Sequence, residues 1–210
     1  MQIPVLDDLP RPADKAFALL HPAHVFNKLV WEFANLKAAA TKERPAELFL
    51  SNVPAYHAFN FAVTAWHLVD WVWAAIHEKD RECLKEFFGC IAMDKKAHLF
   101  DAIARKYRCI HLCGQIANGS KHRELWPSVD DPNVKVNIVW EGLPGRAGEL
   151  RCNDPIVTYK RRLVIRDGTA DLEALEVFRE VVRTWSNLLG AWGFIEDRLI
   201  GPDYEPPPWA

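Results

Sequence analysis

The feature that most constrains this fold is a nearly continuous apolar run from Phe59 to Ile76. Its length approaches that of a membrane span, yet polar residues interrupt it at Asn60, Thr64, His67 and Asp70. An ionisable side chain in the middle of a bilayer is costly. The run therefore favours the central helix of a water-soluble protein over a membrane-spanning segment. We expect no membrane partner.

The composition is that of an ordinary globular domain. The chain has 210 residues, enough for one domain with a sizeable core. Nine Trp and eleven Phe supply bulky apolar side chains, so such a core needs neither a disulfide nor a metal to stabilise it. The formal net charge of −2 argues against a protein that holds nucleic acid by bulk positive charge alone, but it allows a local basic face.

Cysteine usage and the start of the chain both favour a cytoplasmic location. The cysteines are odd in number and form no C-x-x-C pair (Cys83, Cys90, Cys109, Cys113 and Cys152). This pattern is typical of buried thiols in a reducing compartment. The N-terminal arm, residues 1–21, begins with an acidic, proline-containing segment, where a signal peptide would have basic residues followed by an apolar stretch.

Proline, glycine and capping residues predict where the helices begin and end. A helical pattern begins at Pro22, and Ser51-Asn52-Val53-Pro54 combines capping side chains with a first-turn proline. Gly89 is placed to end a short helix and Asp94 to cap the next one, which we expect to continue through Asn118-Gly119. The predicted helices are 22–40, 53–77, 80–88 and 94–124.

The pattern then changes to strands. Residues 134–140 and 156–165 alternate apolar and polar positions and are rich in β-branched side chains, which predicts a β-hairpin with a long loop at about 134–166. A final helix with a clean apolar face follows the break at Asp167-Gly168. We therefore expect a mainly α fold: a four- to five-helix bundle over residues 22–198 with one β-hairpin before its last helix. Residues 199–210 form a C-terminal tail.

Two polar stripes run through these apolar helices. His111, Gln115, Asn118 and His122 fall within roughly 40° of one line on the predicted helix 94–124. Asn60, Thr64 and His67 form a similar line on the helix 53–77, with Asp70 about 80° away from it. A buried polar group without a partner costs about 1–3 kcal/mol. The two stripes are therefore expected to face each other or a shared cleft.

Two interpretations of these stripes need no basic residues. They can be an internal hydrogen-bond network that fixes how two helices pair. Alternatively, His67, Asp70, His111 and His122 can bind a metal ion, because imidazole and carboxylate are suitable ligands and facing helices can supply them. The metal interpretation is the weaker one, since the chain has no E-x-x-H pair. We expect no metal and no cofactor.

A third interpretation adds the basic residues beside the second stripe. If the helix 94–124 is continuous, Arg108 lies about 60° from His111 around its axis and Arg105 about 120°. Arginine binds phosphate oxygens through paired donors, and histidine can move a proton near neutral pH. Together these groups are what a protein needs to bind RNA phosphate and activate a 2′-hydroxyl. The alternative for the arginines is a solvated helix face.

These residues resemble a known family. A helical bundle whose late helix carries Arg105-Lys-Tyr-Arg-Cys-Ile-His111 is similar to the HEPN superfamily, in which an arginine is followed after four to six residues by a histidine. The segment Asn118-Gly-Ser-Lys121-His122 also resembles an N-x-x-K-H element of HEPN-like proteins. The likeness of architecture covers roughly residues 22–198. Lys106 stands where many HEPN proteins have Asn, Asp or His.

The resemblance implies metal-independent RNA cleavage. His111 would act as general base or acid, with Arg105 or Arg108 steadying the phosphate. It also implies a composite site across a homodimer and a toxin or phage-defence role, with a protein partner or antitoxin. A catalytically silent member that only binds a partner is the alternative. The expected substrate-binding residues are Gln115, Asn118, Lys121, His122, His67 and Asp70.

Overall fold

The computed structural model describes residues 19–41, 52–121, 130–144 and 157–195. Within them the chain is mainly helical, with a small antiparallel sheet before the last helix, as predicted. The α-helices are α1 (Pro22–Thr41), α2 (Val53–Ala75), α3 (Arg81–Phe88), α4 (Lys96–Lys106), α5 (Arg108–Lys121) and α6 (Ala174–Ala191). The strands are β1 (Val134–Pro144), β2 (Val157–Asp167) and β3 (Ala170–Glu173).

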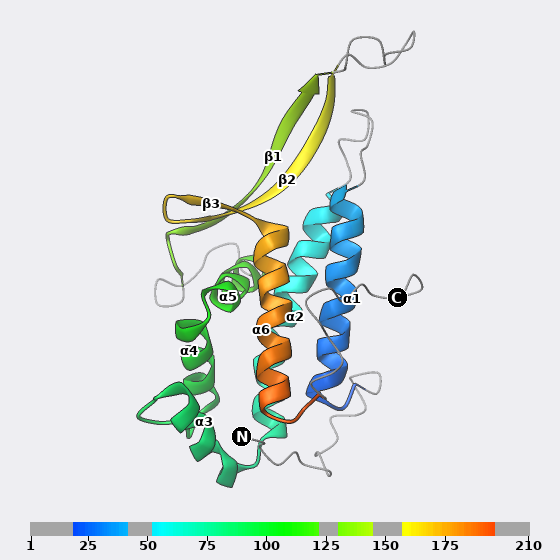
Figure 1. Cartoon of the computed structure of the whole chain (residues 1–210). Coiled ribbons are helices and arrows are strands. Elements are labelled where there is room, and N and C mark those ends of the chain that lie inside the picture. Colours follow the sequence, from blue (N-terminus) through cyan, green and yellow to red (C-terminus); the bar gives the residue numbers. More distant parts are fainter. Residues whose placement is uncertain (1–18, 42–51, 122–129, 145–156, 196–210) are drawn as a thin grey trace.

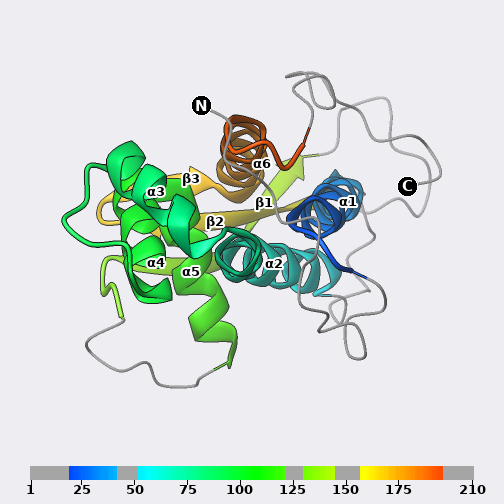
Figure 2. The same cartoon turned by 90° about the horizontal axis from the view of Figure 1, so that it is seen from below.

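The helices surround α2. Figures 1 and 2 show α1 on one side of α2, the α3–α5 group on the other, and α6 beside both α1 and α2. The hairpin of β1 and β2 crosses the ends of these helices and extends past the ends of α1 and α2 (Figure 1). The sheet therefore has one end against the helical body and one end that projects from it.

The apolar run that contains α2 is the centre of the core. Phe61 is fully buried, and its ring centroid lies 5.9 Å from that of Phe33 on α1 and 4.5 Å from that of Phe178 on α6. Leu68 and Val72 continue the buried face along α2. This burial of apolar surface is the main favourable term in folding. No helix among the described residues is long and apolar enough to cross a membrane.

Most predicted helix ends are confirmed. The first helix begins at Pro22, and Pro54 occupies the first turn of α2, where its missing N–H costs nothing. That helix ends at Ala75, two residues before the predicted end. Gly89 ends α3 with a φ of 64°, a left-handed conformation that favours glycine.

The prediction of one helix over 94–124 is wrong. The helix is interrupted at Tyr107, whose extended backbone (φ −127°, ψ 93°) separates α4 from α5. Asp94 does not cap α4: the N-cap position is Lys95 without a side-chain cap, and Asp94 lies 2.9 Å from His98 Nδ1 instead. The expected continuation through Asn118-Gly119 is confirmed as far as Lys121, and residues 122–124 lie outside the described part.

Tyr107 makes the break without a glycine or a proline. Its N–H donates to the Ile103 carbonyl at 2.9 Å, while its own carbonyl accepts the N–H groups of Ile110 (3.0 Å) and His111 (3.1 Å). The residue thus closes one helix and opens the next with its backbone groups satisfied. Because Ile103 and Ile110 are both fully buried, the change of direction keeps both helices packed on the core.

The sheet contains the predicted hairpin and one strand more. Antiparallel pairing runs from Val134 opposite Asp167 to Pro144 opposite Val157. The strand β3, which was not predicted, pairs with β2 after a turn in which Gly168 has a φ of 61°. The strand order is β1-β2-β3, so β1 is an edge of the sheet.

Candidate functional site

The most concentrated polar contacts at the candidate residues surround Asp131, in the segment that leads into β1. We call Arg108, His111, Gln115, Asp131 and Asp167 the Asp131 cluster. Its members come from the start of α5, from the segment before β1 and from the end of β2. The cluster therefore connects the helical body to the sheet.

Arg108 binds both carboxylates of the cluster. Its Nε and Nη2 donate to Asp167 Oδ2 and Oδ1 at 2.9 and 2.5 Å, and Nη2 also donates to Asp131 Oδ2 at 2.9 Å. Paired donors of this kind are the strong, geometrically specific form of an arginine–carboxylate contact. The hydrogen bonds to Asp167 and Asp131 raise the pKa of Arg108, so the guanidinium is always charged.

Both carboxylates are held ionised. The hydrogen bond from Arg108 keeps the pKa of Asp167 below its ordinary value. Burial on its own would raise the pKa of Asp131, but hydrogen bonds from Arg108, from the Asn133 N–H and from His111 outweigh it and lower that pKa. Each carboxylate is mostly buried in the fold, with its charge satisfied by donors of the protein.

His111 and Gln115 complete the cluster from one face of α5. Nε2 of His111 lies 3.2 Å from Asp131 Oδ2, and the Gln115 side-chain oxygen accepts the Asp131 backbone N–H at 2.9 Å. The His111 side chain keeps 25% of its surface exposed. A carboxylate that bonds one imidazole nitrogen fixes the orientation of the ring and leaves the other nitrogen to exchange a proton. This histidine is thus both positioned and accessible.

The other residues proposed on this stretch are placed differently. Because the helix breaks at Tyr107, Arg105 lies on the exposed last turn of α4, and the predicted angle of about 120° between Arg105 and His111 does not apply. Asn118 is partly exposed on α5, and Lys121 is its last residue. His122 lies outside the described residues.

The polar residues of α2 contact different elements. Thr64 accepts a hydrogen bond from Lys28 of α1 at 2.5 Å, Asp70 lies 2.5 Å from Lys96 Nζ at the start of α4, and Asn60 is exposed. The prediction that the two stripes face each other is therefore wrong for Thr64, which contacts α1. Asp70, expected about 80° from that stripe, contacts α4. His67 is partly buried and has an interaction of its own.

A glycine, and not the polar residues, allows the close approach of α5 to α2. A Cβ placed on Gly114 would lie 2.8 Å from the Trp66 ring, so the absence of a side chain lets the two helices pack at this point. The Trp66 ring in turn packs against Phe100 of α4 at a centroid distance of 4.6 Å. Gly114 therefore has a packing role in the middle of α5.

The sequence analysis missed Asp131 and Asp167, the two carboxylates of the cluster. Both stand at turn signals beside the predicted strands, Asp131-Pro132-Asn133 and Asp167-Gly168. The register of an antiparallel hairpin brings the start of its first strand beside the end of its second, here Val134 opposite Asp167. That register is the signal that could have found them.

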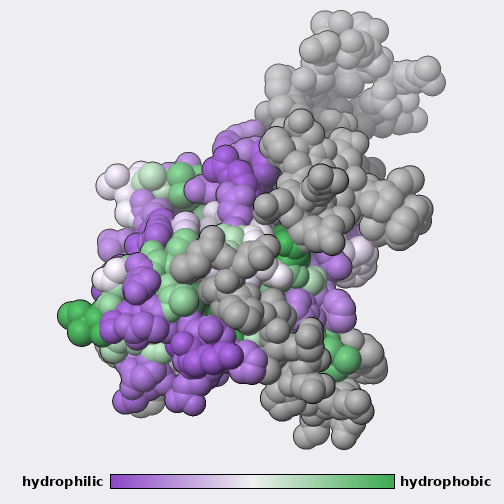
Figure 3. All heavy atoms as spheres, turned by 60° about the horizontal axis from the view of Figure 1, so that its bottom comes forward, coloured by the Kyte–Doolittle hydropathy of each residue, from purple (hydrophilic) through white to green (hydrophobic). Residues whose placement is uncertain are grey.

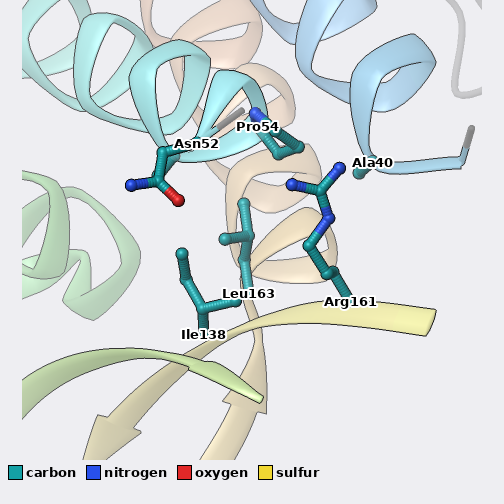
Figure 4. Close-up of a pocket in the computed structure, with 7 residues that line it drawn as sticks. Ala40, Asn52, Pro54, Ile138, Arg161 and Leu163 are labelled. Carbon is teal, nitrogen blue, oxygen red and sulfur yellow. The ribbon is translucent and has the colours of Figure 1, made fainter. Parts of the chain in front are cut away.

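Outside the cluster the described surface offers little that is built as a site. No group of three or more His, Cys, Asp or Glu side chains in the described ranges is arranged to hold a metal ion. Hydrophilic and hydrophobic residues are interspersed on the face in Figure 3. A small hollow lies between the hairpin and the facing ends of α1 and α2, where Ile138 and Leu163 point toward Pro54, and Arg161 extends toward Ala40 (Figure 4).

Neither the family models, nor the curated proteins, nor the solved structures contain a match to this chain.

Proposed function

We propose that this chain is a metal-independent, HEPN-like ribonuclease in which His111 moves the proton and Asp131 positions its imidazole. The observation that carries the proposal is the His111–Asp131 pair: the two side chains lie 3.2 Å apart and the imidazole keeps a quarter of its surface exposed. A histidine oriented by a carboxylate is a common arrangement for general acid–base catalysis.

The reaction needs one base and one polarised phosphate. His111 accepts the proton of a ribose 2′-hydroxyl, and the oxygen attacks the adjacent phosphorus. The bond from phosphorus to the 5′-oxygen breaks, and that oxygen takes a proton from water. The products are a 2′,3′-cyclic phosphate and a free 5′-hydroxyl. The imidazolium then returns its proton to solvent, so the step needs no metal ion and no oxidant.

The ion pairs of Arg108 change the role expected for the arginines. The guanidinium of Arg108 already binds two carboxylates, so it serves to position Asp131 and is not free to bind a phosphate. Arg105 is exposed at the end of α4, and no ion pair holds it within the described part of the chain. We assign phosphate binding to Arg105. A toxin or phage-defence role in the cytoplasm and assembly as a homodimer belong to the same proposal.

RNA cleavage in EDTA tests the proposal. We expect the purified chain to cleave single-stranded RNA, and His111→Ala to lower the rate by roughly a hundredfold or more. The matched control is His98→Ala, because His98 forms another histidine–aspartate pair (2.9 Å to Asp94) outside the cluster. An intact chain that leaves a panel of RNAs uncut would overturn the proposal, and so would equal loss of activity in both variants.

The second candidate is a non-catalytic binding module, which the ion pairs of Arg108 favour. In that case the Asp131 cluster only joins α5 to the sheet. His111→Ala and Gln115→Ala would then lower the melting temperature, and the unmodified chain would cleave no RNA. A His111→Ala variant that melts like the parent but has lost cleavage would exclude this candidate.

A further inference from the structure

The outer edge of β1 has no strand beside it among the described residues, although β1 is eleven residues long. Its side chains are unusually apolar for such a position: Val136, Val139 and Trp140 are 45%, 39% and 46% exposed. An edge strand presents a row of backbone N–H and C=O groups that can pair with another strand. A long edge strand with exposed apolar side chains, and with no strand beside it in the described part of the chain, is therefore a surface that favours strand addition.

The sequence of β1 is complementary to itself around Ile138. Lys135 and Glu141 each stand three positions from Ile138, one on either side. In an antiparallel pair of two copies with Ile138 opposite Ile138, Lys135 of each copy lies opposite Glu141 of the other. Because the two copies are related by a two-fold axis, the pair of Lys135 and Glu141 occurs twice in the dimer.

The apolar positions match in the same register. Val136 and Trp140 stand two positions from Ile138, so each Val136 lies opposite a Trp140 of the second copy. Pairs of an aromatic and a β-branched residue directly opposite each other stabilise a sheet. Val139 lies opposite Asn137, both of which are exposed. No position in this register places two like charges opposite each other.

We propose that β1 pairs with β1 of a second copy of this chain, antiparallel and centred on Ile138. The two three-stranded sheets then form one sheet of order β3-β2-β1-β1-β2-β3, a size typical of natural sheets. The inference names a surface for the homodimer of the proposed function, but it is argued from the edge strand alone, so the RNA-cleavage experiment does not decide it.

The described helices and strands leave room for this pairing. The hairpin extends past the ends of α1 and α2, so the antiparallel partner places its helical body beyond the projecting end (Figure 1). Glu141 already accepts a hydrogen bond from Arg162 through Oε1 at 2.6 Å. A carboxylate has acceptor sites for more than one donor, so Glu141 can bind a lysine of the second copy as well.

Charge exchange tests both the surface and the register. The full-length chain is measured by sedimentation equilibrium over a wide range of concentration. We expect a dimer for the unmodified chain and roughly tenfold or greater weakening of the dimer in Lys135→Glu and in Glu141→Lys. In a dimer of either single variant, residues 135 and 141 carry the same charge, and the two-fold axis repeats this unfavourable pair twice. The double variant restores the opposite charges and with them the dimer.

Mixing the two single variants gives the sharpest result. In a mixed dimer the glutamate introduced at position 135 lies opposite the lysine introduced at position 141. The unchanged Glu141 of the first variant lies opposite the unchanged Lys135 of the second, so the mixture dimerises more tightly than either variant does alone. Circular dichroism of each variant confirms that it is folded.

Four outcomes overturn the proposal. The first is a monomer at every concentration, and the second is a dimer that neither single variant weakens. The third is a mixture of the two variants that fails to recover the dimer. The fourth is recovery of the dimer only when another protein or peptide is present.

Discussion

Arg108 binds Asp167 through two hydrogen bonds, across 59 residues of chain, and so joins the start of α5 to the end of β2. This contact decides how the polar residues of α5 are used. The Arg108 guanidinium donates hydrogen bonds to both carboxylates that lie near α5, those of Asp131 and Asp167. Asp131 in turn orients His111. One of the two arginines predicted to bind phosphate thus belongs to the framework of the candidate site.

Removal of Arg108 should destabilise the fold. Arg108→Ala leaves Asp131 and Asp167 without their shared donor, and we expect a loss of about 1–2 kcal/mol in the free energy of unfolding. The matched control is Arg166→Ala, because Arg166 makes the same paired contact with Asp171 at 2.6 and 2.9 Å, but on the exposed surface of the sheet. Urea denaturation that shows equal losses for the two variants would contradict the structural role of Arg108.

Acid should weaken the same contact. The pKa of Asp167 is lower in the folded chain than in the unfolded chain because of its hydrogen bond from Arg108. Its contribution to stability is therefore fully present above the unfolded pKa of about 3.9 and disappears as pH falls through the lower folded pKa. We expect Asp167→Asn to flatten the fall in melting temperature below about pH 4. Asp101→Asn, at an exposed position on α4, is the control and should leave that fall unchanged.

The two glycines of α5 should respond in opposite directions to alanine. At Gly114 a Cβ would lie 2.8 Å from the Trp66 ring, whereas at Gly119 it would meet nothing within 4 Å. We expect Gly114→Ala to cost about 1–3 kcal/mol by forcing α5 away from α2. Gly119→Ala should stabilise the chain by up to about 1 kcal/mol through helix propensity. Thermal melts that rank the two variants in the reverse order would show that α5 does not pack on Trp66.

Loss of an exposed lysine should cost more than neutralisation of the buried glutamate beside it. Glu32 of α1 has a side chain only 5% exposed, and Lys28 donates to its Oε1 at 2.5 Å and to Thr64. Lys28→Ala leaves a buried carboxylate without its cation, and we expect a loss of about 1–3 kcal/mol. Glu32→Gln removes the charge and should cost less. Chemical denaturation of both variants measures the difference, and a milder effect of Lys28→Ala would refute this view of the pair.

The cysteines should differ in reactivity. Burial raises the pKa of the Cys109 thiol and, more strongly, that of Cys113, so neither forms the reactive thiolate readily. Cys83 and Cys90 are only partly buried. We expect iodoacetamide to modify Cys83 and Cys90 before Cys109 and Cys113 in the native chain, as followed by mass spectrometry of peptides. Rapid modification of Cys113 without unfolding would show that the core around it opens.

Helix ends were predicted correctly where a residue in the sequence marks them directly. Local chemistry is enough to place Pro22 and Pro54 at helix starts and Gly89 at a helix end, because each residue restricts its own backbone. The break at Tyr107 has no such signal, since the pairing of whole helices on the core requires it. Helical angles counted across that break were therefore misleading.

The candidate site shows the same limit. The spacing of His111 and Gln115 correctly placed both residues on one face of a helix, and both contact Asp131. The partner of that helix face depends on tertiary structure. The segment before β1 contacts it, and the register of the hairpin determines this contact, whereas the helical period of α5 does not. For Thr64 and Asp70 the partners come from α1 and α4, which no pattern within α2 could reveal.

The edge position of the hairpin also has a consequence for how the protein opens. Strands β1 and β2 are paired along their full length, so the hairpin is held mainly by contacts that are local in the sequence. Its attachment to α5 relies on a few charged contacts at one end. Ile165 of β2 is buried in the same core as Phe61, so this end of the sheet opens only together with the helices. We expect the amides of the projecting end of the hairpin to exchange with solvent deuterium before those of α2.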